Sequence, residues 1–323
     1  MLVDTIRHFA KQFAFNPEIN NTTHLVRASK FIVCAMGGSA HPSALIKICR
    51  PELDIIIHRS YNLPRLTPAD LASRLVFAIS YSGNTEESLD AYDTARAQGL
   101  PVVAVAAGGA LLERARRDSV PYIKLPDATI EPRSGMGYTV RAELALLDDK
   151  DGLRETSALV NSLDAAAAEV IGQTLAKKLH GSIPIIYASH DNAYLAYVWK
   201  IKFNETAKIP AFCHEFPELN HNEFNGFDYA PANHFLSKPF HFVFLKDPAD
   251  HPSILKRFAV TERLCKDRGL SVEVVELAGA SKWEKIFTSL LVADWTCLFL
   301  AQSYGVVPDG QPMVEEFKCL MAT

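Results

Sequence analysis

Leu75-Val-Phe-Ala-Ile-Ser-Tyr-Ser-Gly-Asn-Thr85 is the stretch that decides the fold class of this chain. Its first five residues are apolar throughout, as in a strand that is buried on both faces of a sheet. Hydroxyl side chains and Gly83 follow, and a helical pattern then occupies residues 86–98. A buried strand, a tight turn and a helix in this order predict an α/β fold built on a parallel sheet.

The hydroxyl side chains of this turn belong to Ser80, Ser82 and Thr85. They stand before a helix N-terminus, where unpaired backbone N–H groups and the helix dipole favour an anion. The turn contains no lysine and lacks the glycine spacing of a nucleotide P-loop. We therefore predict a site for a phosphorylated metabolite rather than for ATP.

Apolar runs and helical patterns alternate along the rest of the chain. In the first half, strands are expected at 31–35, 54–58, 75–80, 102–106 and 122–125, and helices at 40–49, 86–98 and 111–118. A largely helical stretch at 134–180 precedes a second round, with strands at 183–188, 241–245 and 271–276 and helices at 193–207, 253–267, 282–304 and 313–320. This alternation predicts two doubly wound domains, each a mostly parallel sheet flanked by helices, at 1–150 and 151–323.

The composition is that of an ordinary globular protein, with 48% hydrophobic and 22% charged residues among 323. A net charge of −4 gives no attraction to nucleic acid or to an anionic membrane surface. The six cysteines include no CxxC pair, so neither a disulfide framework nor a zinc site is expected. No apolar run approaches the ~20 residues of a membrane span, and the first residues lack a signal-peptide pattern. We therefore expect a cytoplasmic protein.

A second glycine-bearing turn, Met36-Gly-Gly-Ser39, follows the strand at 31–35. Gly38 lets the backbone pass close to a ligand, and Ser39 has a hydroxyl at the start of the next helix. Parallel sheets bind ligands beyond the carboxyl ends of their strands, so this turn is expected to share the phosphate site. Arg133 follows a proline in a loop that enters a helix, and a cation held there suits charge that develops on a substrate oxygen.

Two later segments contain candidate acid–base groups. Glu205 lies late in a helix with apolar neighbours, an environment that can raise the pKa of a carboxyl towards neutrality. His221 is flanked by two asparagines that can set its tautomer. On the local pattern alone, Glu218 and Glu223 remain rival bases, and His214 is a weaker histidine candidate. None of these residues has the spacing of a metal site such as HExxH, so no metal is expected.

Taken in order, these segments resemble the bifunctional phosphoglucose/phosphomannose isomerase family of the sugar isomerase (SIS) superfamily. The resemblance runs from Met36-Gly-Gly-Ser39 to Lys318 and covers nearly the whole chain. Ser82-Gly-Asn-Thr85 marks the superfamily, whereas Asn204-Glu-Thr-Ala-Lys208 followed by Pro217-Glu-Leu-Asn-His-Asn-Glu223 is much more specific. The resemblance implies two SIS-type domains, the first with the phosphate loops and the second, with the C-terminal helix, completing the active site.

The resemblance also implies an aldose–ketose isomerase of hexose 6-phosphates that needs neither metal nor organic cofactor. It implies that Glu205 moves the proton between C1 and C2 and that Arg133 steadies the enediolate. His221 would assist ring opening from the partner subunit of a homodimer. Lys318, which by itself looks like a solvated lysine, would join it near the ring oxygen. The substrate phosphate would be held by Gly38, Ser39, Ser80, Ser82 and Thr85.

The chain departs from the family pattern at three positions. Ala35 stands where glycine is usual, and Thr206 replaces the usual asparagine after the base. Gln311 stands where members with dual specificity resemble one another in having threonine, and conventional phosphoglucose isomerases have glutamine there. We hypothesise that Gln311 narrows the pocket around C2 and C3 and disfavours mannose 6-phosphate. Glucose 6-phosphate and fructose 6-phosphate are the expected pair, and activity on mannose 6-phosphate stays open.

Other functions use similar phosphate loops. An amino-sugar phosphate deaminase or deglycase with SIS domains would have a similar base, but the segment at 217–223 argues against it. A non-catalytic sugar-phosphate sensor would keep the loops, yet it would need none of Glu205, Arg133 and His221. A nucleotide-binding dehydrogenase is the weakest alternative, because the GxGxxG pattern is missing.

Overall fold

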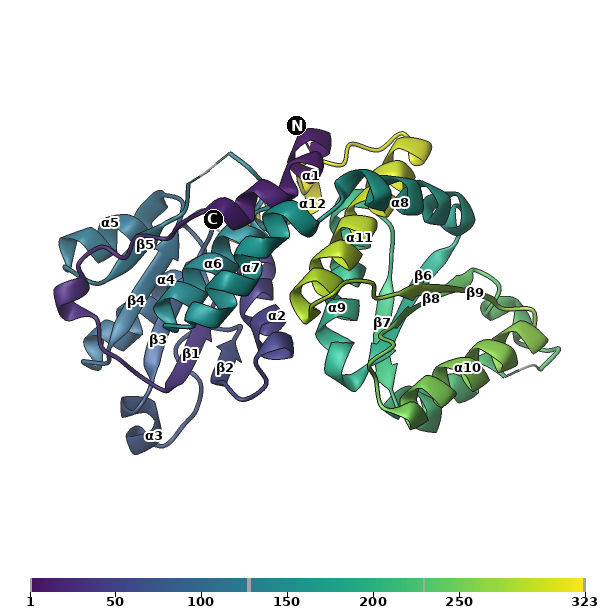
Figure 1. Cartoon of the computed structure of the whole chain (residues 1–323), viewed down its shortest axis with the longest axis horizontal. Helices are drawn as coiled ribbons and strands as arrows, with labels where there is room; N and C mark the ends of the chain where they lie inside the picture. The colour runs from purple at the N-terminus through teal and green to yellow at the C-terminus, as the bar shows by residue number, and fades with distance from the viewer. Residues whose placement is uncertain (1, 127–128, 229, 322–323) are drawn as a thin grey trace. The chain divides into compact units, whose positions relative to one another are not determined.

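A computed structural model describes residues 2–126, 129–228 and 230–321 of the chain (Figure 1). The chain divides into two compact units. The N-terminal unit is His8–Leu163, and the C-terminal unit consists of the described residues of Met1–Arg7 and Asp164–Thr323. Each unit contains one parallel sheet with helices around it, which confirms the predicted α/β architecture.

The N-terminal unit is built on a five-stranded parallel sheet in the order β2-β1-β3-β4-β5. Its strands are β1 (Lys30–Cys34), β2 (Asp54–His58), β3 (Leu75–Ile79), β4 (Val102–Ala106) and β5 (Tyr122–Lys124). β3 and β4 are buried along their full length, as their continuous apolar sequence predicts. The strand order reverses at β1, because β2 lies on one side of it and β3 on the other.

Helices cover both faces of this sheet. They are η1 (Phe9–Ala14), η2 (Thr22–His24), η3 (Gly37–Ser39), α2 (His41–Cys49), α3 (Pro68–Ala72), α4 (Glu86–Ala97), α5 (Gly109–Arg117), η4 (Pro132–Ser134), α6 (Met136–Leu146) and α7 (Lys150–Ser162). Tyr92 of α4 and Leu111 of α5 pack with Ile32, Val76 and Ala104 of the strands on one face. The connections from β1 to β2 and from β3 to β4 run in opposite directions, so right-handed crossovers place α2 on the other face.

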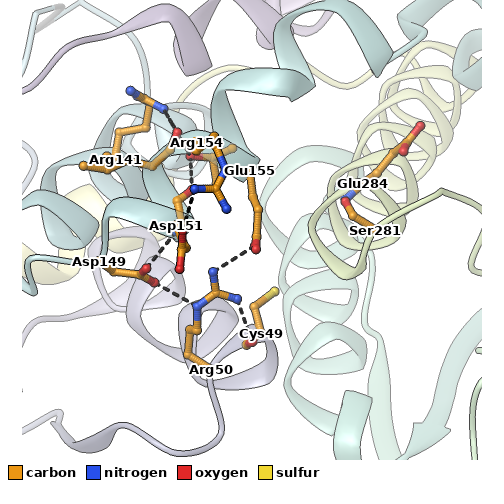
Figure 2. A network of polar contacts seen from close by, with 12 residues as sticks. Cys49, Arg50, Arg141, Asp149, Asp151, Arg154, Glu155, Ser281 and Glu284 are labelled. Atoms are coloured by element: carbon orange, nitrogen blue, oxygen red, sulfur yellow. Dashed lines mark hydrogen bonds and ion pairs between the residues drawn. The ribbon is translucent and has the colours of Figure 1, made fainter.

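Helix α7 belongs to the N-terminal unit, although most of it lies beyond the domain boundary that the sequence predicted near 150. Arg50, just after α2, donates hydrogen bonds to Asp149 Oδ2 at 2.9 Å and to Glu155 Oε2 at 2.8 Å (Figure 2). Arg141 of α6 donates to the carbonyl of Leu153 at 2.9 Å. These bonds hold α7 on α2 and α6, and no periodicity within a helix reveals such partners.

The C-terminal unit is built on a four-stranded parallel sheet in the order β7-β6-β8-β9. Its strands are β6 (Ile183–Ser189), β7 (Phe212–Phe216), β8 (Phe240–Lys246) and β9 (Ser271–Glu276). Its helices are α1 (Leu2–Arg7), α8 (Ala165–Leu179), η5 (His190–Asn192), α9 (Ala193–Lys202), the π-helix η6 (Phe203–Ala207), η7 (Glu218–His221), η8 (Glu223–Phe227), η9 (His234–Leu236), α10 (Pro252–Asp267), α11 (Lys282–Tyr304) and α12 (Pro312–Met321). Helix α1 joins this unit through Arg7, whose guanidinium lies 5.6 Å from the ring centroid of Trp295.

Aromatic side chains form the core on one face of this sheet. Tyr187, Phe216, Phe242 and Phe244 of the strands pack with Phe258 of α10. Helix α11 is a second core element. Among the described residues it is the one helix long and apolar enough to cross a membrane by length and composition, but 72% of its most apolar window is buried within the protein. We therefore interpret α11 as a core helix.

The strand β7, the short helices α1 and α3 and the end of α9 differ from the sequence prediction. The strands other than β7 match the predicted ranges to within one residue at each end. β7 was not predicted, because it is an edge strand with His214 and Glu215 at its centre and shows neither alternation nor an apolar run. The predicted helix at 193–207 ends as an α-helix at Lys202 and continues as one π-helical turn, η6.

Candidate functional site

The N-terminal sheet has a switch point between β1 and β3, at the carboxyl ends of both strands. Doubly wound sheets bind ligands at this position, because the two following turns leave the sheet in opposite directions there. The turn after β1 contains Gly38 and Ser39, and the turn after β3 contains residues 80–85. Ser39 Oγ accepts a hydrogen bond from Tyr81 N at 2.9 Å. The two turns with predicted phosphate ligands are therefore in direct contact.

Ser80 is the centre of a hydroxyl cluster in the turn after β3. Its Oγ lies 2.8 Å from Thr85 Oγ1 and 3.4 Å from Ser82 Oγ, and it accepts a hydrogen bond from Gly83 N at 3.0 Å. Ser80 is fully buried, whereas Ser82 is exposed and Thr85 is partly exposed. The Thr85 side chain makes no capping bond to the start of α4. Ser80 thus orders the turn, and the hydroxyls of Ser82 and Thr85 can donate to an anion at the helix start.

Glycines allow three turns to pack closely at this position. A Cβ atom on Gly38 would lie 2.8 Å from the backbone N of Arg133. A Cβ atom on Gly135 would lie 2.4 Å from the ring of Tyr81. A side chain at either glycine would therefore push the Arg133 turn away from the two phosphate loops. The close packing explains why glycine stands at both positions.

A fourth turn, between β4 and α5, supports the hydroxyl cluster. Gly83 has a φ of +77°, and a Cβ atom on it would lie 1.8 Å from the carbonyl oxygen of Gly108. Asn84 Oδ1 accepts a hydrogen bond from Ala110 N at 3.0 Å, and Leu111 N donates to Gly83 O at 2.9 Å. In the Ser-Gly-Asn-Thr sequence, the two middle residues therefore hold the turn in place, and the two outer residues carry the hydroxyls.

Arg133 is buried in η4, with 3% of its surface exposed. Its Nη1 lies 3.6 Å from Glu131 Oε2. Gln12 of η1, also buried, holds the same segment: its Nε2 donates to Ser134 O at 2.6 Å, and its Oε1 accepts from Gly137 N at 2.9 Å. Burial strengthens the interaction of a guanidinium with an anionic oxygen, so Arg133 is suited to stabilise developing negative charge.

A buried carboxyl group links the two helices that follow these turns. Glu143 of α6 has no exposed surface, and its Oε2 accepts a hydrogen bond from Ser43 Oγ of α2 at 2.6 Å. Burial raises the pKa of Glu143 to about 8, although the bond from Ser43 acts in the opposite direction. At neutral pH the Glu143 carboxyl is therefore mostly protonated, and the burial of a full charge between the helices is avoided.

In the C-terminal unit, Glu205 lies in the π-helical turn η6 and is partly buried. Single π-helical turns are rare and occur frequently at functional sites. Lys202, 1% exposed, places its Nζ 2.6 Å from Asp294 Oδ1 of α11. Trp199 Nε1 donates to Ser289 Oγ, also of α11, at 2.9 Å. These buried bonds anchor the end of α9 on α11 and so hold the turn that carries Glu205.

The two rival carboxylates both have structural partners. Glu223 Oε1 accepts a hydrogen bond from the hydroxyl of Tyr187 at 2.5 Å. Burial and the neighbouring Glu223 raise the pKa of Tyr187, which therefore remains a donor. Glu218 Oε1 accepts a hydrogen bond from Asn222 Nδ2 at 2.7 Å. These bonds give both carboxylates a structural role.

His214 is part of a small His–Glu group. Its Nδ1 lies 3.8 Å from Glu215 Oε2, and Glu215 Oε1 lies 3.7 Å from His190 Nδ1. His214 Nδ1 also accepts a hydrogen bond from the backbone N of Glu215 at 2.8 Å. Within residues 2–126, 129–228 and 230–321, no group of three or more His, Cys, Asp or Glu side chains is arranged to hold a metal ion.

The predicted site residues fall into two sets. The structure brings one set together in the N-terminal unit: Gly38, Ser39, Ser80, Ser82, Thr85 and Arg133. The other set belongs to the C-terminal unit: Glu205, His221, Gln311 and Lys318. His221 is exposed at the end of η7, Gln311 immediately precedes α12, and Lys318 lies in α12, where every described side chain is exposed.

The C-terminal sheet has its own switch point, between β6 and β8, and a carboxyl group of the chain lies there. Asp250 Oδ1 accepts a hydrogen bond from Ser189 Oγ at 2.8 Å, and Asn192 Nδ2 donates to Ser189 Oγ at 3.1 Å. Asp250 is 9% exposed, and burial raises its pKa. A phosphate dianion would meet a carboxyl group at this position instead of a cluster of free hydroxyl donors.

Several residues that shape the site were not singled out from the sequence. Gln12, Lys202 and Asp294 carry no local signal, because their partners lie far away in the chain. The pair Gly108-Gly109 could have been found. It follows the strand at 102–106 and begins a helix, in the same strand–turn–helix pattern that marks the other turns.

Comparisons with known proteins agree with this architecture. A family model described as the bacterial phospho-glucose isomerase C-terminal SIS domain matches residues 169–321. A bifunctional phosphoglucose/phosphomannose isomerase of Aquifex aeolicus is 30% identical over 296 residues, which cover 89% of this chain and 88% of the relative. The protein of that name from Caldicellulosiruptor bescii is 31% identical over 310 residues, which cover 91% and 89%. The crystal structure of glucosamine-6-phosphate deaminase from Thermotoga maritima matches with a TM-score of 0.69 over 96% of each chain, at 16% identity, which shows a shared fold alone.

Proposed function

Because the chain belongs to the family of bifunctional phosphoglucose/phosphomannose isomerases, we infer that it is an aldose–ketose isomerase of hexose 6-phosphates. Glucose 6-phosphate and fructose 6-phosphate are the proposed pair, and mannose 6-phosphate is a further proposed substrate. The observation that carries this proposal is the hydroxyl cluster of Ser80, Ser82 and Thr85 at the switch point. Neutral donors at a helix start suit a phosphate dianion that must also leave.

The phosphate serves as the anchor of the sugar in this proposal. Its oxygens would accept hydrogen bonds from the two turns of the N-terminal switch point. Binding energy gained at this remote group orients the reacting carbons. The protein groups around C1 and C2 therefore need not supply that binding energy themselves. The proposed phosphate ligands are Gly38, Ser39, Ser82 and Thr85, and the buried hydroxyl of Ser80, first expected among them, orders the turn that presents them.

The reaction requires a base that removes the proton from C2 of the aldose and returns it to C1. We assign this role to Glu205, whose carboxylate takes the proton and, once protonated, gives it back to the neighbouring carbon. Removal of the proton leaves an enediolate with negative charge on oxygen. Arg133, a buried cation, would stabilise that charge, and a base without such a cation would achieve little.

The proposed active site needs residues from both units and from a second subunit. His221 of the partner subunit and Lys318 would assist ring opening near the ring oxygen. The homodimer is supported by the exposed apolar face of α12. Met313, Phe317, Leu320 and Met321 recur there at helical spacing and are 83%, 61%, 68% and 61% exposed. A cytoplasmic location and independence of cofactors remain predictions from the sequence.

A coupled assay tests this function directly. The purified chain is given glucose 6-phosphate, mannose 6-phosphate or glucosamine 6-phosphate, and formation of fructose 6-phosphate and of ammonia is followed. We expect turnover of glucose 6-phosphate that survives EDTA and exceeds the turnover of mannose 6-phosphate. Equal turnover of the two aldoses would remove the role given to Gln311. Release of ammonia and fructose 6-phosphate from glucosamine 6-phosphate, without turnover of glucose 6-phosphate, would replace the proposal with the deaminase alternative. Binding without any turnover would favour a sensor.

A further inference from the structure

Lys208 is the last residue of the Asn-Glu-Thr-Ala-Lys motif, and the proposed mechanism gives it no role. It ends the π-helical turn η6 in a left-handed conformation, with a φ of 58°. This conformation is uncommon for a residue other than glycine, and such residues are held in place by the surrounding structure. The side chain is partly buried. The contacts of the Lys208 side chain therefore need an explanation.

The ammonium group of Lys208 joins two segments that are far apart in the chain. Its Nζ donates one hydrogen bond to Glu205 O and another to Gly310 O, each at 2.5 Å. Hydrogen bonds from a charged donor are shorter and stronger than those between neutral groups. One side chain thus connects the backbone of the proposed base to the loop that precedes α12.

The loop that Lys208 holds leads directly into the C-terminal helix. Gly310 has a φ of +74° and is followed by Gln311, whose carbonyl accepts a hydrogen bond from Glu315 N at 2.9 Å in the first turn of α12. No side chain in the described helix α12 is buried. Packing of its own side chains therefore does little to hold this helix on the C-terminal unit. The hydrogen bond from Lys208 Nζ to Gly310 O is thus an important attachment of the segment.

We propose that Lys208 is a positioning residue that ties residues 310–321 to the turn carrying Glu205. Glu205, which removes the proton, and Lys318, which acts at the ring oxygen, must serve the same sugar. The Lys208 bridge sets the spacing between their segments. Its catalytic consequence rests on the proposed function, whereas the tether itself is a property of the fold.

The tether is tested by hydrogen exchange and limited proteolysis of Lys208→Met, Lys208→Arg and the control Lys200→Met. Lys200 belongs to the same unit, and its Nζ lies 6.0 Å from the Tyr197 ring centroid. We expect exchange of residues 306–321 to become about tenfold faster, with earlier cleavage near Gly310, in Lys208→Met alone. Lys208→Arg should restore part of the protection.

Equal protection in all variants would overturn the proposal, whatever the enzymatic activity. If Lys208→Met does not fold, Lys208→Gln takes its place.

Kinetics of the isomerase test the catalytic consequence. We expect Lys208→Met to lower kcat at least tenfold with a smaller change in KM, because the phosphate anchor lies in the other unit. Lys318→Ala should cost much less activity in the Lys208→Met background than in the wild type, since the helix is already released. Additive losses would contradict the positioning role. A wild type without isomerase activity would reject the proposed function and leave the exchange experiment to decide on the tether.

Discussion

Glu205, the proposed base, lies on a single turn of π-helix, and the surrounding residues hold this turn in place. Lys202 is buried against Asp294 immediately before the turn, and Lys208 closes it with a hydrogen bond to the backbone of Glu205. A carboxylate in such a turn is displaced from the regular path of the helix. In the proposed mechanism, the fixed backbone would let the side chain meet the substrate without a large loss of entropy.

Replacement of Glu205 by glutamine tests its role as base. Glu205→Gln preserves the size of the side chain but replaces one acceptor oxygen with an amide group that cannot take up a proton. We expect kcat to fall by about 10²- to 10⁴-fold, while the affinity for a sugar phosphate changes little. Stopped assays and calorimetric titration with fructose 6-phosphate measure the two quantities. Glu223→Gln, at the carboxylate bound by Tyr187, is the matched comparison. A normal kcat in Glu205→Gln would end its assignment as base.

Glu143 predicts a pH dependence of stability at the scale of one residue. Its pKa rises from an ordinary value of 4.5 to about 8 in the folded state, mainly through burial. Between these values the folded chain keeps a proton that the unfolded chain releases, so the free energy of unfolding falls as the pH rises. The slope from one such group is at most about 1.4 kcal/mol per pH unit. Its favourable contribution is complete below pH 4.5 and lost above about pH 8.

The variant Glu143→Gln should remove this part of the pH dependence while retaining a partner for Ser43. Urea unfolding of the wild type and the variant at several pH values between 5 and 8 measures the difference. The exposed Glu52→Gln serves as control and should leave the slope unchanged. Identical slopes for Glu143→Gln and the wild type would show that Glu143 ionises normally in the folded chain.

The candidate phosphate site is made by turns that follow different strands and contact one another. Strand order alone places the turns after β1 and β3 at the same switch point. Their close contact depends on Gly38, which permits the backbone of Arg133 to approach, and on the bond between Ser39 and Tyr81. The hydroxyl cluster and the buried cation are therefore positioned by backbone packing, which no single motif contains.

Gln12 links η1 to the start of α6, so its removal should affect both stability and activity. Gln12→Ala leaves the buried carbonyl of Ser134 and the amide of Gly137 without their partner. We expect the free energy of unfolding to fall by about 2 kcal/mol or more. We also expect kcat/KM to fall under conditions where the variant remains fully folded, because the turn that carries Arg133 loses its support. The exposed Gln98→Ala is the control, and a variant at Gln12 with wild-type stability and kinetics would refute this function.

The two units contain different sets of candidate residues. The N-terminal unit contains the hydroxyl cluster and Arg133, and the C-terminal unit contains Glu205, His221 and Lys318. The C-terminal switch point is occupied by Asp250 and its hydrogen bonds to Ser189. The two sheets therefore carry different side chains at their switch points, and this supports the proposal of one phosphate site per chain.

Mixed dimers test whether His221 acts across the subunit interface. Chains with Glu205→Gln and chains with His221→Ala are each expected to be nearly inactive. When co-expressed with different tags and purified as the mixed dimer, they form one site that has both wild-type side chains, provided His221 comes from the partner subunit. About half of the wild-type activity should then return. A mixed dimer as inactive as its parents would place His221 and Glu205 of one site in the same chain.

Much of the fold was predictable because the relevant signals are local. β3 and β4 are continuous apolar runs that end in turn residues, and α11 spans the whole range that its pattern predicts. β7 escaped prediction, because an edge strand needs no continuous apolar sequence. The boundary near 150 differs from the observed division after Leu163, because Arg50 and Arg141 bind α7 from other helices. Contacts of this kind depend on tertiary packing and produce no periodicity in the sequence.

By itself, the sequence determined the alternation of strands and helices, the hydroxyl-rich turn at a strand end and the candidate acid, base and cation. These follow from side-chain chemistry and from spacing between near neighbours. Three contacts became visible in the folded chain alone: Ser80 orders the turn, Gln12 supports the segment of Arg133, and Lys208 joins Glu205 to the C-terminal segment. The physical reason is that hydrogen bonds between distant segments form only after the cores of the units have brought those segments together.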